Sequence, residues 1–111
     1  MSELDNILKQ LSALSQSTRL RAFKMLMEAD HSGIPAGVIA DKLDVAPNSL
    51  SAHLTILTSS GLVSVERQGR KMIYRPEINS VNSMLYELVK TYCNKHPKVF
   101  QTLNELKDEP A

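Results

Sequence analysis

Apolar residues recur every three or four positions along most of this chain, which is the spacing of amphipathic helices. The run from Leu4 to Leu14 predicts a first helix over residues 2–14. Polar residues then interrupt the pattern, and a second apolar run follows in which Ser17 or Thr18 can cap the helix. The chain is therefore expected to begin with two consecutive helices.

The next stretch combines turn residues with two shorter apolar runs. The cluster Asp30–Pro35 predicts a turn, and Pro35 suits the first turn of a short third helix. Asp44 is expected in the tight turn that follows, because Asp tolerates unusual backbone angles. Pro47 then begins a fourth helix, and Gly61 ends it. Two short helices joined by a tight turn are typical of a helix-turn-helix motif.

A change from helical to alternating spacing marks the segment Leu62–Ile78. Apolar and polar residues alternate on both sides of Gln68 and Gly69, which predicts a β-hairpin with its turn at these two residues. Helical spacing returns over residues 79–107, with a break at Pro97. The expected fold is mainly α with a small β-hairpin: a winged helix-turn-helix with further helices at both ends of the chain.

The fourth helix lies in a stretch, Val45–Val63, that contains no Asp, Glu, Lys or Arg. On a helical wheel Leu50, Leu54 and Leu57 point in one direction, toward a core. The opposite side carries short side chains that can reach base edges in the major groove of DNA, and the alternative is a merely solvated surface. His53 stands at the border, as a phosphate contact or a packing residue. The predicted base-reading residues are Asn48, Ser49, Ser51, Ala52 and Thr55.

The predicted hairpin places positive charge directly after this helix. Four cations lie within nine residues, from Arg67 to Arg75, and the one carboxylate beside them is that of Glu66. In a winged protein such cations contact phosphates, which gives affinity without reading the sequence. The alternative is that they only protect the strand edges from pairing with other chains. The predicted contacts of the wing are Arg67, Gln68, Arg70, Lys71 and Arg75.

Composition narrows the classes of function. The 111 residues suggest one domain, and a formal net charge of +1 excludes coating of nucleic acid through bulk charge. The single cysteine excludes an internal disulfide and fits a reduced cytoplasmic setting. We expect neither a signal peptide in MSELDNILKQ nor a membrane-spanning stretch. No catalytic triad, phosphate loop or carboxylate pair stands out, so an enzyme is not expected.

Two segments, LSALSQSTRLRAFKML and VIADKLDVAPNSLSAHLTILTSSGLVSVERQGRKMIYR, carry a family resemblance. They are similar to the helix-turn-helix and wing sequences of the ArsR/SmtB family of small bacterial repressors. The resemblance covers roughly Leu11–Arg75 and is uninterrupted through the fourth helix and the hairpin. It departs from the family at Gln16-Ser17, where Asp-Pro is usual, and at Ala46-Pro47, where a capping Ser and Gln are usual.

The resemblance implies a homodimer that binds a two-fold symmetric operator in double-stranded DNA. Residues 1–111 would form one domain, with the winged helix-turn-helix over residues 17–75. The dimerisation helices would be those over residues 2–14 and 79–107, whose apolar stripes fit that role. Taken alone, the same stripes are also compatible with burial inside one subunit.

Many members of this family release DNA when they bind a metal or metalloid. The resemblance implies that two of the usual sites are absent: Pro35 and Gly37 replace a cysteine pair, and residues 81–92 contain neither Asp nor His. Cys93 matches one cysteine of a third, three-thiolate pattern, and His96 lies close to it in sequence. One interpretation is a thiophilic metal, metalloid or redox site at Cys93; the other is that Cys93 packs and His96 ends a helix. No other cofactor is expected.

The sequence thus predicts a cytoplasmic, sequence-specific DNA-binding regulator. The resemblance makes it a homodimeric repressor that a ligand or thiol modification releases from its operator. The alternatives are an effector-independent repressor and a winged-helix module that binds protein instead of DNA. A protein-binding module should lack the cations of the wing and carry apolar residues on the outer side of the fourth helix, where Ile56 is the one large candidate.

Overall fold

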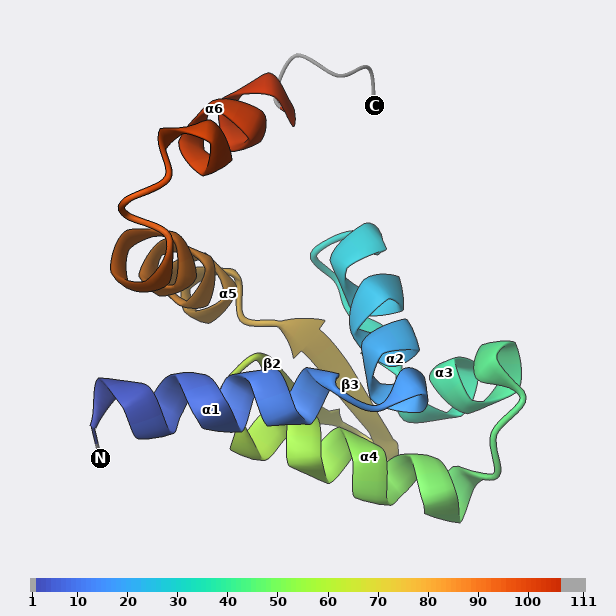
Figure 1. Cartoon of the computed structure of the whole chain (residues 1–111). Helices are drawn as coiled ribbons and strands as arrows, with labels where there is room; N and C mark the ends of the chain where they lie inside the picture. Colours follow the sequence, from blue (N-terminus) through green and yellow to red (C-terminus); the bar gives the residue numbers. More distant parts are fainter. Residues whose placement is uncertain (1, 107–111) are drawn as a thin grey trace.

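The structure, a computed structural model, describes residues 2–106. Its elements, in chain order, are α1 (Glu3–Leu14), α2 (Ser17–Glu28), β1 (Ile34–Pro35), α3 (Ala36–Leu43), α4 (Pro47–Ser59), β2 (Val63–Gln68), β3 (Lys71–Pro76), α5 (Ile78–Glu87), the π-helical turn η1 (Leu88–Tyr92) and α6 (Pro97–Leu106). Figure 1 shows the helices and the small sheet. The predicted winged helix-turn-helix is confirmed. Residue 107 of the predicted C-terminal helices lies outside the described residues, as do the outermost ends of the predicted domain.

The core is built around the apolar side of α4. Leu50, Leu54 and Leu57 are almost completely buried, as predicted. They belong to one cluster that includes Leu26 of α2 and Ile39 of α3. Because these three side chains come every three or four positions, burying them fixes which side of α4 faces outward.

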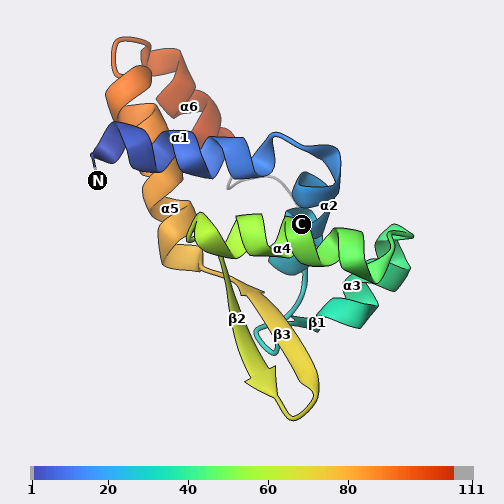
Figure 2. The same ribbon diagram turned by 90° about the horizontal axis from the view of Figure 1, so that it is seen from below.

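Helix α1 lies beside α4 in both views of the ribbon (Figures 1 and 2). It contributes Ile7 and Ala13 to the core, whereas Leu4, Leu8 and Leu11 remain exposed. The apolar stripe of the predicted first helix is therefore split between a buried side and an exposed side.

The start of α2 differs from the prediction in its cap. The side chain of Gln16, not of Ser17 or Thr18, accepts a hydrogen bond from the amide of Arg19 (3.0 Å). Gln16 is the last residue with an extended backbone, so Ser17 and Thr18 already lie inside the helix. Gln is an unusual cap, since shorter polar side chains are preferred there.

The sheet has three antiparallel strands in the order β1-β3-β2, one strand more than predicted. β1 was missed because its residues, Ile34 and Pro35, belong to a cluster typical of turns, yet they pair with Tyr74 and Ile73 of β3. Pro35 thus ends a strand and precedes α3 instead of opening it. Asp44, with φ 55°, occupies the tight turn between α3 and α4 as predicted.

The turn of the hairpin is shifted by one residue from its predicted place. Gln68 pairs with Lys71, so the two turn residues are Gly69 and Arg70. Gly69 has φ 64°. A positive φ at the first turn position is the requirement of a type II′ hairpin, which glycine meets without strain.

The C-terminal helices depart from regular geometry. The predicted helix over residues 81–92 is α-helical only to Glu87 and continues as the π-helical turn η1. Cys93 follows with φ −124°, and its carbonyl accepts from the amide of His96 at 3.0 Å. Cys93 and His96 therefore lie in a turn and not on one side of a continuous helix. Pro97 then begins α6.

We expect Gly33→Ala to lower the free energy of unfolding by about 2 kcal/mol, because a left-handed backbone disfavours a Cβ. Gly33 has φ +82°, and an added Cβ would lie 2.7 Å from the backbone oxygen of Tyr74 and 2.8 Å from the side chains of Ile73 and Arg75. The matched control is Gly37→Ala within α3, where an added Cβ has no neighbour within 4 Å. It should raise stability by about 0.5–1 kcal/mol through helix propensity. Urea unfolding at equal protein concentration measures both, and similar effects of the two changes would contradict this account.

Candidate nucleic-acid interface

The outer side of α4 is uncharged and open to solvent. The predicted base-reading side chains all belong to this exposed side: Asn48, Ser49, Ser51, Ala52 and Thr55. The hydroxyl of Thr55 donates to the backbone oxygen of Ser51 (3.0 Å), so the Thr55 oxygen can still accept a hydrogen bond. The surface therefore combines donors, acceptors and methyl groups, the features that distinguish base pairs in a major groove.

The hairpin extends away from the helices, with its turn at the far end (Figure 2). Arg70 and Lys71 are exposed at this end, and within residues 2–106 no hydrogen bond or ion pair engages their side chains. Arg67 is partly engaged, since its Nε donates to the carbonyl of Gly69 at 3.1 Å. The side-chain Nε2 of Gln68 donates to Oε1 of Glu66 at 3.2 Å. The two most available cations of the wing are thus at its tip.

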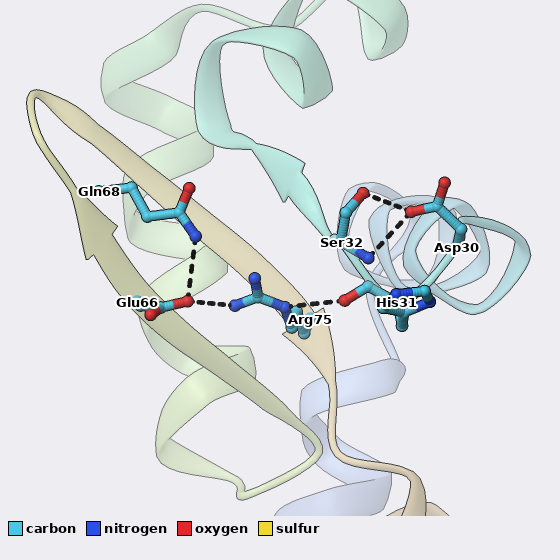
Figure 3. A network of polar contacts seen from close by, with 6 residues as sticks. All are labelled: Asp30, His31, Ser32, Glu66, Gln68 and Arg75. Atoms are coloured by element: carbon cyan, nitrogen blue, oxygen red, sulfur yellow. Dashed lines mark hydrogen bonds and ion pairs between the residues drawn. The ribbon is translucent and has the colours of Figure 1, made fainter.

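Arg75 makes two contacts with other parts of the protein (Figure 3). Its Nη1 donates to Oε1 of Glu66 at 2.7 Å, and its Nε donates to the carbonyl of His31 at 3.0 Å. The second contact joins β3 to the loop after α2. Arg75 therefore fastens the base of the wing, and a contact of Arg75 with phosphate remains a prediction.

Three titrating groups near the sheet depart from their ordinary behaviour. Hydrogen bonds from Arg75 and then from Gln68 lower the pKa of Glu66. Hydrogen bonds from the hydroxyl and the amide of Ser32 lower the pKa of Asp30 in the neighbouring loop. Burial raises the pKa of Tyr74. The two carboxylates of Figure 3 thus stay ionised to lower pH than ordinary carboxylates do.

His53, at the border of the α4 surface, is half-buried and contacts Arg19 of α2. Nη1 of Arg19 lies 3.1 Å from Nδ1 of His53. A phosphate contact by His53 stays a prediction, while the intramolecular contact favours the packing interpretation. Arg19 had no predicted role, although its position within STRLRAF, in the segment that carries the family resemblance, was the available signal.

The candidate inducer site at Cys93 and His96 contains few side chains that could bind a ligand. Cys93 is half-buried and His96 is exposed. Among residues 2–106, no three His, Cys, Asp or Glu side chains come close enough together to hold a metal ion. In the same range, no helix has the length and apolar character that crossing a membrane requires.

Comparison with known proteins finds a family model and a curated relative that match this sequence. A family model described as a helix-turn-helix domain matches residues 14–66. The uncharacterized HTH-type transcriptional regulator YbzH of Bacillus subtilis is 31% identical over 84 residues, which covers 65% of this chain and 84% of YbzH.

Two solved structures share the fold over most of both chains. An ArsR-like transcriptional regulator from Rhodococcus sp. RHA1 superimposes with a TM-score of 0.73 at 24% identity, covering 89% of this chain and 91% of that one. The homodimeric winged helix-turn-helix DNA-binding domain Mb0332 from Mycobacterium bovis gives a TM-score of 0.65 at 25% identity, covering 88% of this chain and 92% of that one.

We expect Glu66→Gln to lower the free energy of unfolding at neutral pH, because it removes the negative charge that Arg75 contacts. The pKa of Glu66 is lowered in the folded protein, so its contribution is present above the ordinary carboxyl range and is lost as the pH falls through the lowered pKa. The difference from wild type should therefore shrink below about pH 4. Urea unfolding across this pH range measures it, with Glu105→Gln on α6 as a control. A difference that does not vary with pH would contradict the role of the ion pair.

Proposed function

Because the chain belongs to the ArsR-type family of winged helix-turn-helix transcriptional regulators, which bind DNA, we propose that it is a homodimeric repressor acting on an operator near its own gene. In this proposal α4 enters the major groove and the β2–β3 wing contacts the adjacent backbone. The observation that carries it is the uncharged, exposed side of α4 followed directly by a hairpin with cations at its tip. A DNA-binding repressor would act in the cytoplasm, where a bacterial chromosome lies.

In this proposal the exposed side of α4 reads the base sequence, and the wing contacts phosphates. Asn48 stands at the N-terminal end of α4, the end of a recognition helix that reaches base edges, and its amide can bond adenine through two hydrogen bonds. Arg70 and Lys71 carry flexible positive charge at the tip of the wing, which suits phosphates. A protein-binding module is less well supported, because the exposed side of α4 offers Ile56 as its one large apolar side chain.

The homodimer is supported by apolar surface that a single described chain leaves uncovered. Leu4 and Leu8 of α1 are 53% and 55% exposed, and Leu85 and Tyr86 of α5 are 53% and 61% exposed. An apolar groove between α5 and α6 continues the α5 part of this surface and is lined by Val89, Phe100 and Leu103 among others. Contiguous apolar surface of this kind marks an association site. A second copy of the chain is the proposed partner, as in the Mycobacterium bovis domain.

The proposed function does not depend on a thiol-bound inducer. Each chain has one cysteine, so a thiophilic metal or metalloid at Cys93 would need donors from both copies of the dimer. Within residues 2–106, no group of three or more His, Cys, Asp or Glu side chains comes together to hold a metal ion, so Cys93 and His96 have no third ligand from their own chain. Effector-independent repression is therefore the simpler form of the proposal, and release through Cys93 is its second form.

The wing assignment predicts that Arg70→Ala weakens binding to every duplex to a similar degree. Loss of one phosphate contact should reduce the slope of log affinity against log salt by about 0.9. Fluorescence anisotropy over a salt series measures this slope on a duplex from the upstream region of the gene and on an unrelated duplex. Lys24→Ala is the control, since Lys24 lies on α2 and pairs with Glu28 at 3.4 Å. An unchanged slope for Arg70→Ala would remove the wing from the interface.

The assignment of α4 predicts a different outcome for Asn48→Ala. Loss of a bidentate base contact should weaken operator binding by about 1–3 kcal/mol and binding to unrelated DNA much less. The same anisotropy assay measures both affinities. Ser59→Ala, at the C-terminal end of the same exposed side, should leave both unchanged. An equal loss of Asn48→Ala on the two duplexes would exclude Asn48 from base reading.

A further inference from the structure

The guanidinium of Arg19 joins three parts of the fold. Arg19 is in the first turn of α2, and its Nε donates to the carbonyl of Ala13 in α1 at 2.7 Å. Its Nη2 lies 3.5 Å from the carbonyl of Ser12, and its Nη1 contacts His53 of α4 at 3.1 Å. Arg19 thus connects the end of α1 with the middle of α4.

The contacts of Arg19 with α1 provide hydrogen-bond donors to carbonyl groups at the C-terminal end of that helix. The last carbonyls of a helix have no partner within it, and basic side chains commonly satisfy them. Ser12 and Ala13 belong to the last turn of α1, and the carbonyl of Ser12 already accepts from the amide and the hydroxyl of Ser15. The carbonyl of Ala13 is therefore the principal attachment point of Arg19 on α1.

The contact of Arg19 with His53 determines which ring nitrogen of the neutral imidazole carries the proton. A guanidinium has donors only, so Nδ1 of His53 must accept the hydrogen bond. The proton of the neutral ring is then on Nε2.

We propose that Arg19 is a positioning residue for DNA binding, which holds α4 at a fixed orientation against α1 through His53. His53 lies directly between Ala52, on the proposed base-reading side, and the fully buried Leu54. A change in the orientation of α4 would displace every base-reading side chain together. Since α1 is part of the proposed dimer interface, the same link ties the recognition helix to dimer geometry. The inference rests on the proposed function.

The chemistry of the link favours arginine over lysine. A planar guanidinium can donate in several fixed directions, whereas an ammonium is a compact charge on a flexible stem. Arg19 uses three of its nitrogens toward two helices. Arg19→Lys retains the charge but not this fork, and it is expected to behave like Arg19→Ala in DNA binding.

The decisive experiment compares two substitutions of His53. In His53→Asn the side-chain oxygen can take the place of Nδ1 and accept from Arg19, whereas His53→Gln places its polar group near the former Nε2. We expect His53→Asn to bind the upstream duplex nearly as wild type does, and His53→Gln and Arg19→Ala to bind about tenfold more weakly. The double variant Arg19→Ala, His53→Gln should bind no more weakly than the weaker single variant, because both changes break one link. Anisotropy gives the affinities, and thermal unfolding confirms that each variant is folded.

Each outcome decides between the alternatives. If His53→Gln retains wild-type affinity for DNA and His53→Asn does not, His53 acts from Nε2 on a phosphate. If the double variant loses affinity by the product of the two single losses, Arg19 and His53 have independent roles. Either result overturns the inference. Wild-type affinity in all variants overturns it as well. If the wild-type protein binds no duplex, the proposed function fails first, and the inference fails with it.

A second measurement is independent of DNA. The two-bond nitrogen–proton correlation spectrum of the histidine rings distinguishes the two neutral tautomers, and the spectrum of His53→Asn assigns the signal of His53. We expect the Nε2–H tautomer for His53 in the wild-type protein and a mixture in Arg19→Ala. A mixture already present in wild type would contradict the link, even if Arg19→Ala proved too unstable for binding studies.

Discussion

The burial of three leucines in α4 is the constraint on which the candidate interface depends. Leu50, Leu54 and Leu57 are at most 1% exposed, so α4 cannot rotate about its axis without exposing apolar surface. Their helical spacing leaves the opposite side of α4 to Asn, Ser, Ala and Thr side chains. Buried apolar residues and exposed polar residues thus occupy opposite sides of the same helix. The surface needs no charge of its own, because the wing supplies it.

Polar contacts refine what the leucines fix. Apolar packing determines the side of α4 that faces outward, but it tolerates small tilts and slides, since it is not directional. The hydrogen bonds of Arg19 to Ala13 and His53 are directional and join α4 to α1. At the other end of the motif, Arg75 fastens the wing to the carbonyl of His31 and to Glu66. Two arginines therefore fasten α4 and the wing to the rest of the fold.

The sequence was a good guide to the elements and a poorer one to their connections. Helical periodicity located α1 and the inward side of α4, because burial imposes its own spacing on the chain. It missed β1, whose two residues are too few to show a period and whose pairing depends on β3, far along the chain. It also missed the cap at Gln16, since Ser17 has the stronger intrinsic preference for that position.

The same reasoning explains which site residues could be anticipated. The exposed positions of Asn48 and Arg70 could be anticipated because helical periodicity and charge are local properties of the sequence, while their roles in DNA binding stay predictions. The partners of Arg75 and His53 were not, because these contacts join residues 44 and 34 positions apart. The π-helical turn before Cys93 has no signal in a pattern that continues evenly to Tyr92. Long-range polar contacts and irregular helix geometry were thus the limit of the prediction.

The small charge of the chain explains why assembly and DNA binding belong together in the proposed function. A net charge of +1 gives little general attraction to DNA, and each wing offers Arg70 and Lys71 as its free cations within the described residues. One chain would therefore make few phosphate contacts and bind weakly. Linking two such modules makes the second binding event intramolecular and raises affinity without any new contact, provided that the geometry fits both half-sites. In the proposed dimer, the interface sets the distance between the two copies of α4, and each α4 must fit its own half-site. This requires a rigid connection from α1 to α4.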